Sequence, residues 1–575
     1  MVAGTASGWG LTRARRCAGA LAWLACMLAA SQAAGQNTSP LRDPNEQLLR
    51  EQQERQRQDL LRQQSAVIQL NLPGAQGAAD DRAPQDISES GPVFKIDTIS
   101  RQGDELLSES EFAGIVAPFM EQPLGTARIN ALLVRLNHAL VAAGYTTSRA
   151  YVGEQDLSAG QLMITVMAGR IEKLLYNNQP LDAPGMTGVR LALPMRQGDI
   201  LRLPDIEQAL DQINRLRRNN AQVQIRPGEQ PGGSIVEIAN APTDGAHYIL
   251  TADNQGMSTT GRLRVQGGWE TGNLLGLMES FSAGLTTSRD TNALYGTFSV
   301  PWGYGTISGL ASWSEYQNLV GDVALVYGAS RSYTLSYGRL IGRSQNSKSA
   351  FEVALTRRES SRFISGAPLP SQTQTVLRLG FNRLQRFQTK HGMGQWSIDA
   401  GLSSGLPWLG SGRDPADVSP DAARYRFTKV ELSGTWERPL TAKITWRSRL
   451  ATQTSDRPLF SSEQIFAGGV GSVRGFAEST WGGDRGGYWR NEWAFKVPAA
   501  RGGNLRFEPY LFLDGARLYT ISDRRWRSLV GGGGGVRMVY GKTSAELILG
   551  KPLSRSNDIL ADKGWRINLS VTYQF

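Results

Sequence analysis

Cysteine, histidine and long apolar runs are all scarce in this chain of 575 residues. Its two cysteines, Cys17 and Cys26, lie near the start, and its three histidines, at positions 138, 247 and 391, lie far apart. Neither set has the spacing of a metal site or of a redox motif. After the first 35 residues, no apolar run reaches the ~18 residues of a membrane-spanning helix. The sequence therefore predicts either a soluble protein or a membrane-spanning β-barrel.

Residues 1–35 have the pattern of a secretory signal peptide. Three arginines between positions 13 and 16 precede an apolar run from about residue 17 to residue 30, and small residues follow. The run is shorter than the ~20 residues of a membrane anchor, and the residues before Cys26 fit a lipidation motif badly. Because both cysteines lie in this segment, the mature chain enters an oxidising compartment with no disulfide to form.

Charge and motifs argue against nucleic-acid binding and against catalysis. The net charge of +11 falls to +8 once the three arginines of the signal peptide are removed, and the remaining charges are scattered. The segment "GGGGGVRMVYGKT" looks like a phosphate-binding loop, but five residues separate Gly535 from Gly541, one more than that motif allows. Gly531–Gly535 is instead expected to form a turn or a place where backbones approach closely. We predict no enzyme, no metal and no cofactor.

Residues 39–64 are rich in Gln, Glu and Arg and are predicted to form a helix of about 20 residues, with Pro44 near its start. The leucines of this segment form no continuous stripe, so the helix is expected to lie in water or in a water-lined space. A solvated tail is the alternative that these residues leave open. Residues 65–91 are predicted to be a flexible linker.

Residues 92–243 contain two similar units, which predict a tandem of small α+β domains over 92–169 and 170–243. Apolar residues at helical spacing mark one helix in each unit: Ile129, Leu132, Leu133, Leu136 and Leu140, then Ile206, Leu210, Ile213 and Leu216. Strand-like sequence follows each helix, and short strands are also expected at "VFKIDTI" (93–99) and "IEKLLYN" (171–177).

From residue 245 to the end, segments of about ten residues alternate between apolar and polar side chains, with turn residues between them. In the last segment, Ile567, Leu569, Val571, Tyr573 and Phe575 alternate with polar residues. A soluble β-sandwich would also alternate, but this length and number of strands are typical of a transmembrane antiparallel β-barrel. At roughly 20 residues per strand and turn, the region has room for about 16 strands. The last strand should pair with the first, because an open edge in lipid leaves backbone groups unsatisfied.

Several motifs give the chain a resemblance to a known family. They are "YTTSRAYVGEQDLSAGQLMITVMAGRI", "IRPGEQPGGSIVEI", "DNQGMSTTGRLRV", "NLLGLMES", "GSVRGF" and "FLDGA", together with the Gln-rich amino-terminal helix and the final Phe575. Over essentially the whole mature chain, the sequence resembles the TpsB family, the outer-membrane transporters of two-partner secretion of the ShlB/FhaC type. The resemblance implies a barrel of about 16 strands in the outer membrane of a Gram-negative cell. It also implies two periplasmic POTRA domains and a helix that plugs the pore.

The resemblance implies partners as well. The POTRA domains are expected to bind a large secreted exoprotein, the TpsA-type passenger, and the pore is expected to export it unfolded. The transporter is expected to be a monomer in outer-membrane lipid. Whether the passenger is an adhesin, a haemolysin or a contact-inhibition toxin is left open by these motifs.

A site in the lumen is also implied. Its motif, "VRGF", consists of Val473, Arg474, Gly475 and Phe476. The motif lies in a Gly-rich stretch over 456–487, longer than the about 12–15 residues beyond which a structureless loop is unusual unless functional. In the family this loop folds back into the lumen, where Arg474 is implied to meet Asp514 of "FLDGA" and to hold the lid loop. Phe512 lies two residues before Asp514, so both should face the same side of a strand. An ordinary surface loop is the alternative.

Three other functions fit less well. A diffusion porin has no use for two α+β domains before its barrel. An autotransporter would carry its own passenger, and residues 35–245 hold no β-helical repeat. A barrel-insertion factor of the same superfamily is the strongest alternative, but such factors usually carry more POTRA domains and lack the amino-terminal helix.

Overall fold

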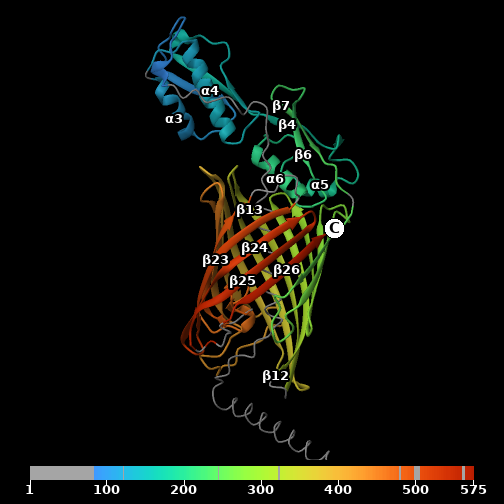
Figure 1. The fold of residues 1–575 in the computed structure, drawn as a ribbon. Coiled ribbons are helices and arrows are strands. Elements are labelled where there is room, and N and C mark those ends of the chain that lie inside the picture. The colour runs from blue at the N-terminus through green and yellow to red at the C-terminus, as the bar shows by residue number, and fades with distance from the viewer. Residues whose placement is uncertain are drawn as a thin grey trace, which may run out of the picture.

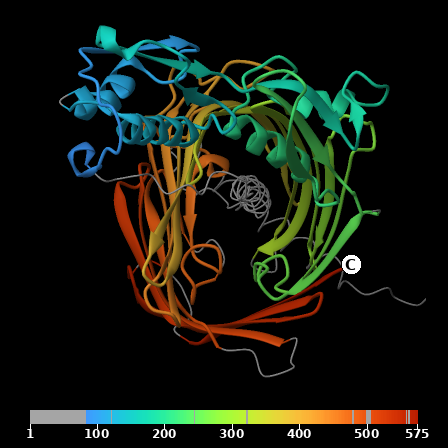
Figure 2. The same ribbon diagram turned by 90° about the horizontal axis from the view of Figure 1, so that it is seen from above.

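The computed structural model describes residues 83–120, 122–243, 245–320, 324–477, 481–497, 505–557, 559 and 564–575 (Figure 1). Two small α+β domains precede one closed barrel, and they lie over part of its rim when the molecule is seen from above (Figure 2). The predicted signal peptide (1–35), helix (39–64) and most of the linker (65–91) lie outside the described residues. Within the described ranges, no helix is long and apolar enough to cross a membrane.

The first domain packs two helices against a three-stranded sheet. Its elements are η1 (Pro84–Asp86), β1 (Thr98–Gly103), α3 (Glu109–Met120), α4 (Thr126–Ala142), β2 (Arg149–Tyr151), η2 (Leu157–Ala159) and β3 (Gln161–Met167). The sheet order is β1-β3-β2, with β1 parallel to β3. The predicted helical stripe is confirmed in α4, where Leu132, Leu136 and Leu140 are buried.

The strand predicted at 93–99 is wrong in its position. The sheet strand β1 begins only at Thr98. Phe94 forms an isolated bridge with Leu124, in which each backbone N–H donates to the other residue's carbonyl at 2.8 Å. The chain is extended there, but it pairs with the connection before α4 and not with the sheet.

The second domain repeats this plan with a four-stranded sheet. Its elements are β4 (Arg170–Tyr176), β5 (Gln179–Pro180), α5 (Thr187–Ala192), α6 (Leu203–Asn214), β6 (Gln222–Pro227) and β7 (Gly233–Ala239). The sheet order is β5-β4-β7-β6. The predicted strand at 171–177 corresponds to β4, and the predicted stripe is buried on α6 at Ile206, Leu210 and Ile213, with Leu216 buried just past its end.

Sixteen long antiparallel strands close the barrel, as predicted. They are β8 (His247–Asp253), β9 (Arg264–Gly272), β10 (Ser280–Thr287), β11 (Thr291–Trp302), β12 (Gly305–Val320), β13 (Ala324–Arg343), β14 (Ser347–Ile364), β16 (Gln372–Thr389), β17 (Gly392–Gly405), β18 (Thr428–Pro439), β19 (Ile444–Ser455), β22 (Arg485–Phe495), β23 (Leu505–Thr520), β24 (Arg525–Tyr540), β25 (Thr543–Arg555) and β26 (Arg566–Gln574). A two-residue strand, β15 (Ala367–Pro368), lies in the connection between β14 and β16.

The last strand pairs with the first, as the barrel prediction requires. β26 is antiparallel to β8, with Tyr573 opposite Leu250. Beyond the strand, the backbones of Phe575 and Tyr248 exchange two hydrogen bonds of 3.0 Å, and their rings stack at 5.4 Å. The chain therefore ends inside the ladder that closes the barrel.

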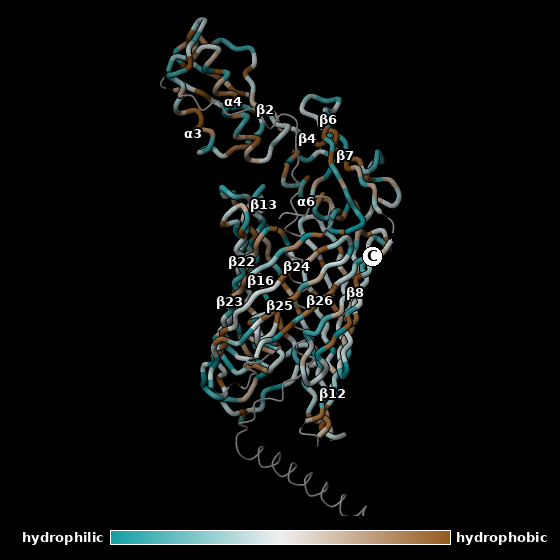
Figure 3. The backbone as a smooth tube through the Cα atoms, in the orientation of Figure 1, coloured by the Kyte–Doolittle hydropathy of each residue, from teal (hydrophilic) through white to brown (hydrophobic). Residues whose placement is uncertain are grey.

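Alternation along the barrel strands separates two surfaces. On β23, Leu511 and Leu513 are 57% and 47% exposed. Phe512 and Asp514, at the alternate positions of the same strand, are buried. Hydrophobic and hydrophilic segments accordingly alternate along the barrel strands in Figure 3. The apolar face points outward and the polar face points into the lumen, which is the arrangement of a barrel in lipid.

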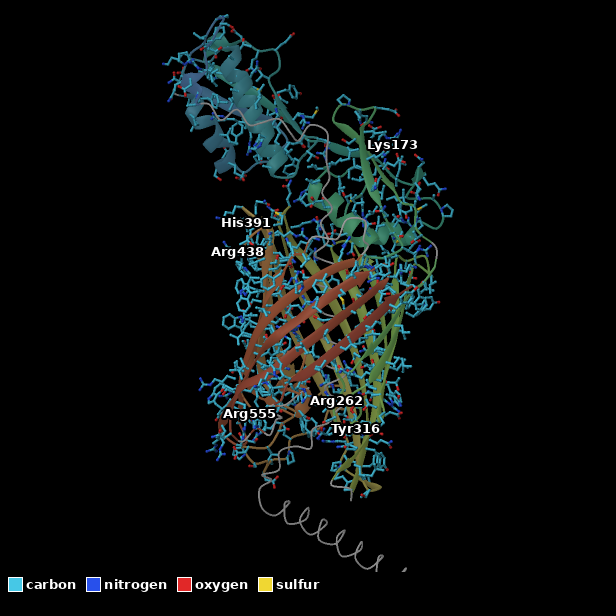
Figure 4. All side chains as sticks on the ribbon, viewed as in Figure 1. Lys173, Arg262, Tyr316, His391, Arg438 and Arg555 are labelled. Atoms are coloured by element: carbon cyan, nitrogen blue, oxygen red, sulfur yellow. The ribbon has the colours of Figure 1, made fainter. Side chains whose placement is uncertain are left out.

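The second domain is attached to one end of the barrel through α6. Arg343 at the end of β13 donates to Glu207 at 2.8 Å, and Lys348 on β14 donates to Asp211 at 2.7 Å. The amide of Gln212 donates to two carbonyls of the β11–β12 turn at 2.8 Å. We call this end the domain-side end and the opposite one the far end. Figure 4 labels His391 and Arg438 at the domain-side end, and Arg262, Arg555 and Tyr316 toward the far end.

Candidate functional site

The connection between β19 and β22, residues 456–484, is the motif loop. It leaves β19 at the far end and contains η3 (Ser461–Glu463) and a hairpin of β20 (Ile465–Ala467) with β21 (Trp481–Gly483). The long loop predicted over 456–487 thus contains secondary structure, and residues 485–487 belong to β22. Its tip contacts lumen-facing residues of β22 and β23, so the loop folds back into the barrel.

Arg474 lies at the tip of the loop and forms an ion pair with the carboxylate of Asp514. Its Nε donates to Oδ2 of Asp514 at 2.7 Å and its Nη2 to Oδ1 at 2.9 Å, which is a bidentate pair. The backbone N–H of Arg474 donates to the same carboxylate at 3.1 Å. Both side chains are almost fully buried, at 1% and 0% exposure. The structure therefore brings together the two charged residues that the resemblance paired.

Phe512 supports the guanidinium from the same face of β23. The guanidinium carbon of Arg474 lies 4.0 Å from the centre of the Phe512 ring, and Tyr510 adds a second ring at 5.7 Å. Such a contact stabilises a cation on an aromatic face. Phe512 and Asp514 do face the same side of the strand, as their spacing predicted.

The glycines of β24 and β25 make the wall behind the tip flat. Gly531–Gly535 lie inside strand β24, so the prediction of a turn in this segment is wrong. The alternative prediction, that backbones approach closely there, is confirmed. A Cβ at Gly531 would collide with the carbonyl oxygen of Arg474, and one at Gly550 would lie 2.8 Å from the backbone nitrogen of Gly475. Gly475 itself has φ of 96°, a conformation that side chains other than glycine rarely adopt.

The remaining motif residues pack into an apolar cluster. Val473 and Phe476 are both buried, on either side of Arg474 and Gly475. The cluster around them also includes Ala467, Tyr488, Ala516, Leu518, Leu529 and Ile559. The tip is thus held by the buried pair of Arg474 with Asp514 and by apolar contacts with the barrel wall.

Glu492 is a site residue that the sequence did not reveal. Its Oε2 accepts from Nη1 of Arg474 at 3.0 Å, and Arg537 on β24 donates to both of its oxygens at 2.6 and 2.8 Å. Polar alternation places Glu492 on the lumen face of β22. Which strand faces the loop depends on the register of the whole barrel, and alternation within one strand carries no information about that register.

These contacts hold a loop in place against the lumen wall. The lumen wall around the tip carries charges of both signs in register, with Arg447 on β19 donating to Glu508 on β23 at 2.6 Å and 3.1 Å. Charged side chains of both signs therefore line the lumen around the tip.

Comparison with known proteins identifies all three parts of the molecule. The model of the haemolysin secretion/activation proteins ShlB/FhaC/HecB matches residues 232–538. A ShlB-type POTRA domain matches residues 94–169, and a further POTRA domain matches residues 170–227.

Individual relatives agree with this assignment. The chain is 34% identical to the outer membrane transporter CdiB of Dickeya dadantii, over 90% of this chain and 92% of that protein. It is 27% identical to the hemolysin transporter protein ShlB of Serratia marcescens, over 86% and 88% of the two chains. The solved structure of CdiB from Escherichia coli superposes with a TM-score of 0.82 at 26% identity, covering 94% of this chain and all of that one. The chain therefore belongs to the ShlB/FhaC/HecB family of haemolysin secretion/activation proteins, and it is an outer-membrane transporter with periplasmic POTRA domains.

Proposed function

We propose that this transporter exports one large partner protein, which its POTRA domains bind unfolded in the periplasm and its lumen conducts to the cell surface. The observation that carries the proposal is a tandem of two POTRA domains, the second attached to the mouth of a barrel whose polar lumen holds the motif loop by buried ion pairs. The alternative, a barrel-insertion factor, is less well supported, because relatives that match most of this chain are named as transporters.

The POTRA sheets offer edges to which an extended partner segment could add a strand. Among the residues that the structure describes, β2 pairs only with β3 in the first domain, and β6 pairs only with β7 in the second. Strand addition gives affinity through main-chain hydrogen bonds and needs little side-chain selectivity. An unfolded polypeptide of varied sequence is the ligand that such edges suit.

Deleting the first POTRA domain tests the proposal. We expect removal of residues 92–169 to abolish export of the large partner protein. The barrel should stay intact, because the contacts of α6 with β13 and β14 belong to the second domain. Export is measured by immunoblot of the medium, and barrel integrity by heat-dependent mobility on a gel. Normal export by an intact deletion variant would refute the proposed role of the domain.

Within this function, the pair of Arg474 and Asp514 is proposed to lock the motif loop in its working position. Loss of one partner of a buried ion pair costs roughly 3–5 kcal/mol, because the other charge stays buried without its partner. Arg474→Ala and Asp514→Ala should therefore each reduce export strongly, and the double variant should lose clearly less than the sum. Lysine cannot replace the bidentate fork, so Arg474→Lys should also fail.

A matched control lies on the opposite face of the same strand. Arg517 on β23 is exposed and lies 5.1 Å from the ring of Trp526. Arg517→Ala removes an arginine without touching the loop, so export should remain at the wild-type rate. If the losses at positions 474 and 514 simply add, the lock does not exist.

A further inference from the structure

The motif loop has a second set of buried charge contacts, nearer its start than the lock. Glu463 lies at the end of η3 and is buried together with both of its cationic partners. Its Oε1 accepts from Nη1 of Arg358 at 2.8 Å, and its Oε2 accepts from Nζ of Lys429 at 2.9 Å. One carboxylate thus bridges β14 and β18, which are separated in the barrel by β16 and β17.

Main-chain and hydroxyl contacts surround this bridge. The carbonyl of Glu463 accepts from the amide of Gln453 on β19 at 2.9 Å and from Lys429 at 3.3 Å. The neighbouring Ser462 donates its hydroxyl to Gln374 on β16 at 2.8 Å, and its carbonyl accepts from Arg358 at 3.2 Å. The loop start is therefore bound to four strands of the wall, β14, β16, β18 and β19.

The two sets of contacts lie on different strands and at different depths. Lys429 and Gln453 lie one and two residues from the far-end termini of β18 and β19, and Arg358 is paired with Gln374, two residues from the far-end terminus of β16. Asp514 lies six residues inside β23. The lock uses β22 and β23, which the strand order places next to β19. The loop consequently begins at the far-end rim beside β14, β16, β18 and β19. Its tip lies deeper in the lumen, against β22 and β23.

We infer that Glu463 is a second positioning residue of the transporter, which holds the base of the motif loop at the far-end rim independently of the lock at Arg474. Release of Arg474 then frees the tip, while Glu463 keeps the base fixed to β14 and β18. The moving part is the segment between the two contacts, and the loop returns to the same place after the tip has moved. The inference adds to the proposed function but concerns the loop alone, so its test needs no partner protein.

The test measures where the loop lies. Because the chain has no cysteine after Cys26, two introduced cysteines carry spin labels without background. Gly471→Cys places one label near the loop tip, where an added Cβ meets nothing within 4 Å, and Ala367→Cys places the other on exposed β15 at the far end. Pulsed electron paramagnetic resonance of the full chain in lipid nanodiscs reports the distance between them. Single-channel conductance in planar bilayers is the second measurement.

A neutral and an inverted variant separate positioning from folding. The neutral variant, Glu463→Gln with Arg358→Gln and Lys429→Gln, removes the bridge and leaves none of its three members charged. Because Lys429 also contacts Glu431 at 3.0 Å, the inverted variant is Glu463→Lys with Arg358→Glu and Lys429→Gln, which restores one attraction with reversed signs and places no second carboxylate beside Glu431. We expect the neutral variant to broaden and shift the distance distribution and to raise conductance, and the inverted variant to return both toward wild type. Each variant is first shown to keep the heat-resistant mobility of the folded barrel.

Arg474→Ala in the same labelled chain provides the comparison. It should change the distance between the labels at positions 471 and 367 although the Glu463 bridge is intact. Combining it with the neutral variant should broaden the distribution of that distance further. The inference is overturned if the neutral variant leaves both the distances and the conductance unchanged. It is equally overturned if the inverted variant behaves like the neutral one, since the charges would then not be what holds the base. A neutral variant that does not fold is replaced by Glu463→Gln with Arg358→Met and Lys429→Met, for which the same two outcomes apply.

Discussion

In strand β3 of the first POTRA domain, Leu162, Ile164 and Val166 point into a core, whereas in β23 of the barrel Leu511 and Leu513 point away from the interior. The local geometry is the same in both strands, with successive side chains pointing to opposite faces. The surroundings differ, because the POTRA domain lies in water and the outer face of the barrel lies in lipid. The comparison shows that alternation identifies two faces of a strand but not which face is inside.

The difference extends to what stabilises each part. The first POTRA domain has a buried apolar cluster that includes Phe112, Phe119, Leu132 and Leu136. The barrel interior instead buries ion pairs, such as Arg474 with Asp514, and closes its backbone hydrogen bonds around the ring. Apolar burial stabilises the domain, whereas satisfaction of backbone groups in lipid stabilises the barrel.

Truncating a POTRA core residue should have the largest effect. Leu136 on α4 is 1% exposed, so Leu136→Ala should destabilise the first domain by about 2–5 kcal/mol. Hydrogen exchange of α4 amides in the full chain measures the loss. Val134, exposed on the same helix, is the matched control, and Val134→Ala should change protection little. Equal effects at the two positions would mean that α4 does not pack as described.

The outer face of the barrel should respond to charge more than to truncation. Leu513 lies well inside β23 and faces outward, so Leu513→Arg should cost about 2–4 kcal/mol near the bilayer midplane. Leu513→Ala keeps an apolar face and should cost much less. Unfolding by denaturant in lipid vesicles, followed by loss of the heat-resistant band, measures both. If arginine and alanine were tolerated alike, position 513 would not face lipid.

Much of this architecture could be predicted from the sequence, for physical reasons. Strand alternation and the absence of apolar helices lead to a barrel, and the spacing of Leu132, Leu136 and Leu140 leads to a helix. Arg474 and Asp514 were paired because their motifs resemble those of the family, not because of their spacing. The helix α3 was missed although Phe112, Val116 and Phe119 share one face, because Pro118 lies inside it and lowers its helix propensity.

The remaining site contacts depend on register between distant strands. Glu492, Gly531 and Glu463 each meet the loop or the wall only because a particular set of turns fixes how the strands align. A shift of one residue in any pairing would turn such a side chain to the outer face. Alternation places each residue on the lumen side, but its partner is determined by the closure of the whole barrel.

The smallest expected effect concerns a charge that caps a POTRA helix. Helix α4 begins after Gly125, which has no side chain to cap it. The carboxylate of Glu89 supplies the cap from far away in the sequence, accepting from the backbone N–H groups of Arg128 at 2.8 Å, Ala127 at 2.9 Å and Gly125 at 3.1 Å. A negative group at this end also interacts favourably with the helix dipole.

The pH dependence of this cap has a definite sign. Partial burial by itself raises the pKa of the Glu89 carboxyl, but hydrogen bonds from Arg128, Ala127 and Gly125 hold that pKa below its ordinary value of 4.5. A lowered pKa in the folded state means that the cap stabilises the domain at pH values above 4.5 and that this stabilisation is lost as pH falls further.

Glu89→Gln should therefore cost about 1 kcal/mol at pH 7, the usual worth of a helix cap. Hydrogen-exchange protection of the first turn of α4, corrected for intrinsic rates, should fall in the variant at pH 7 and converge with wild type under acidic conditions. Glu154, exposed on the same domain, is the control, and Glu154→Gln should leave protection unchanged at every pH. A difference between Glu89→Gln and wild type that persisted at low pH would show that the side chain's shape, and not its charge, caps the helix.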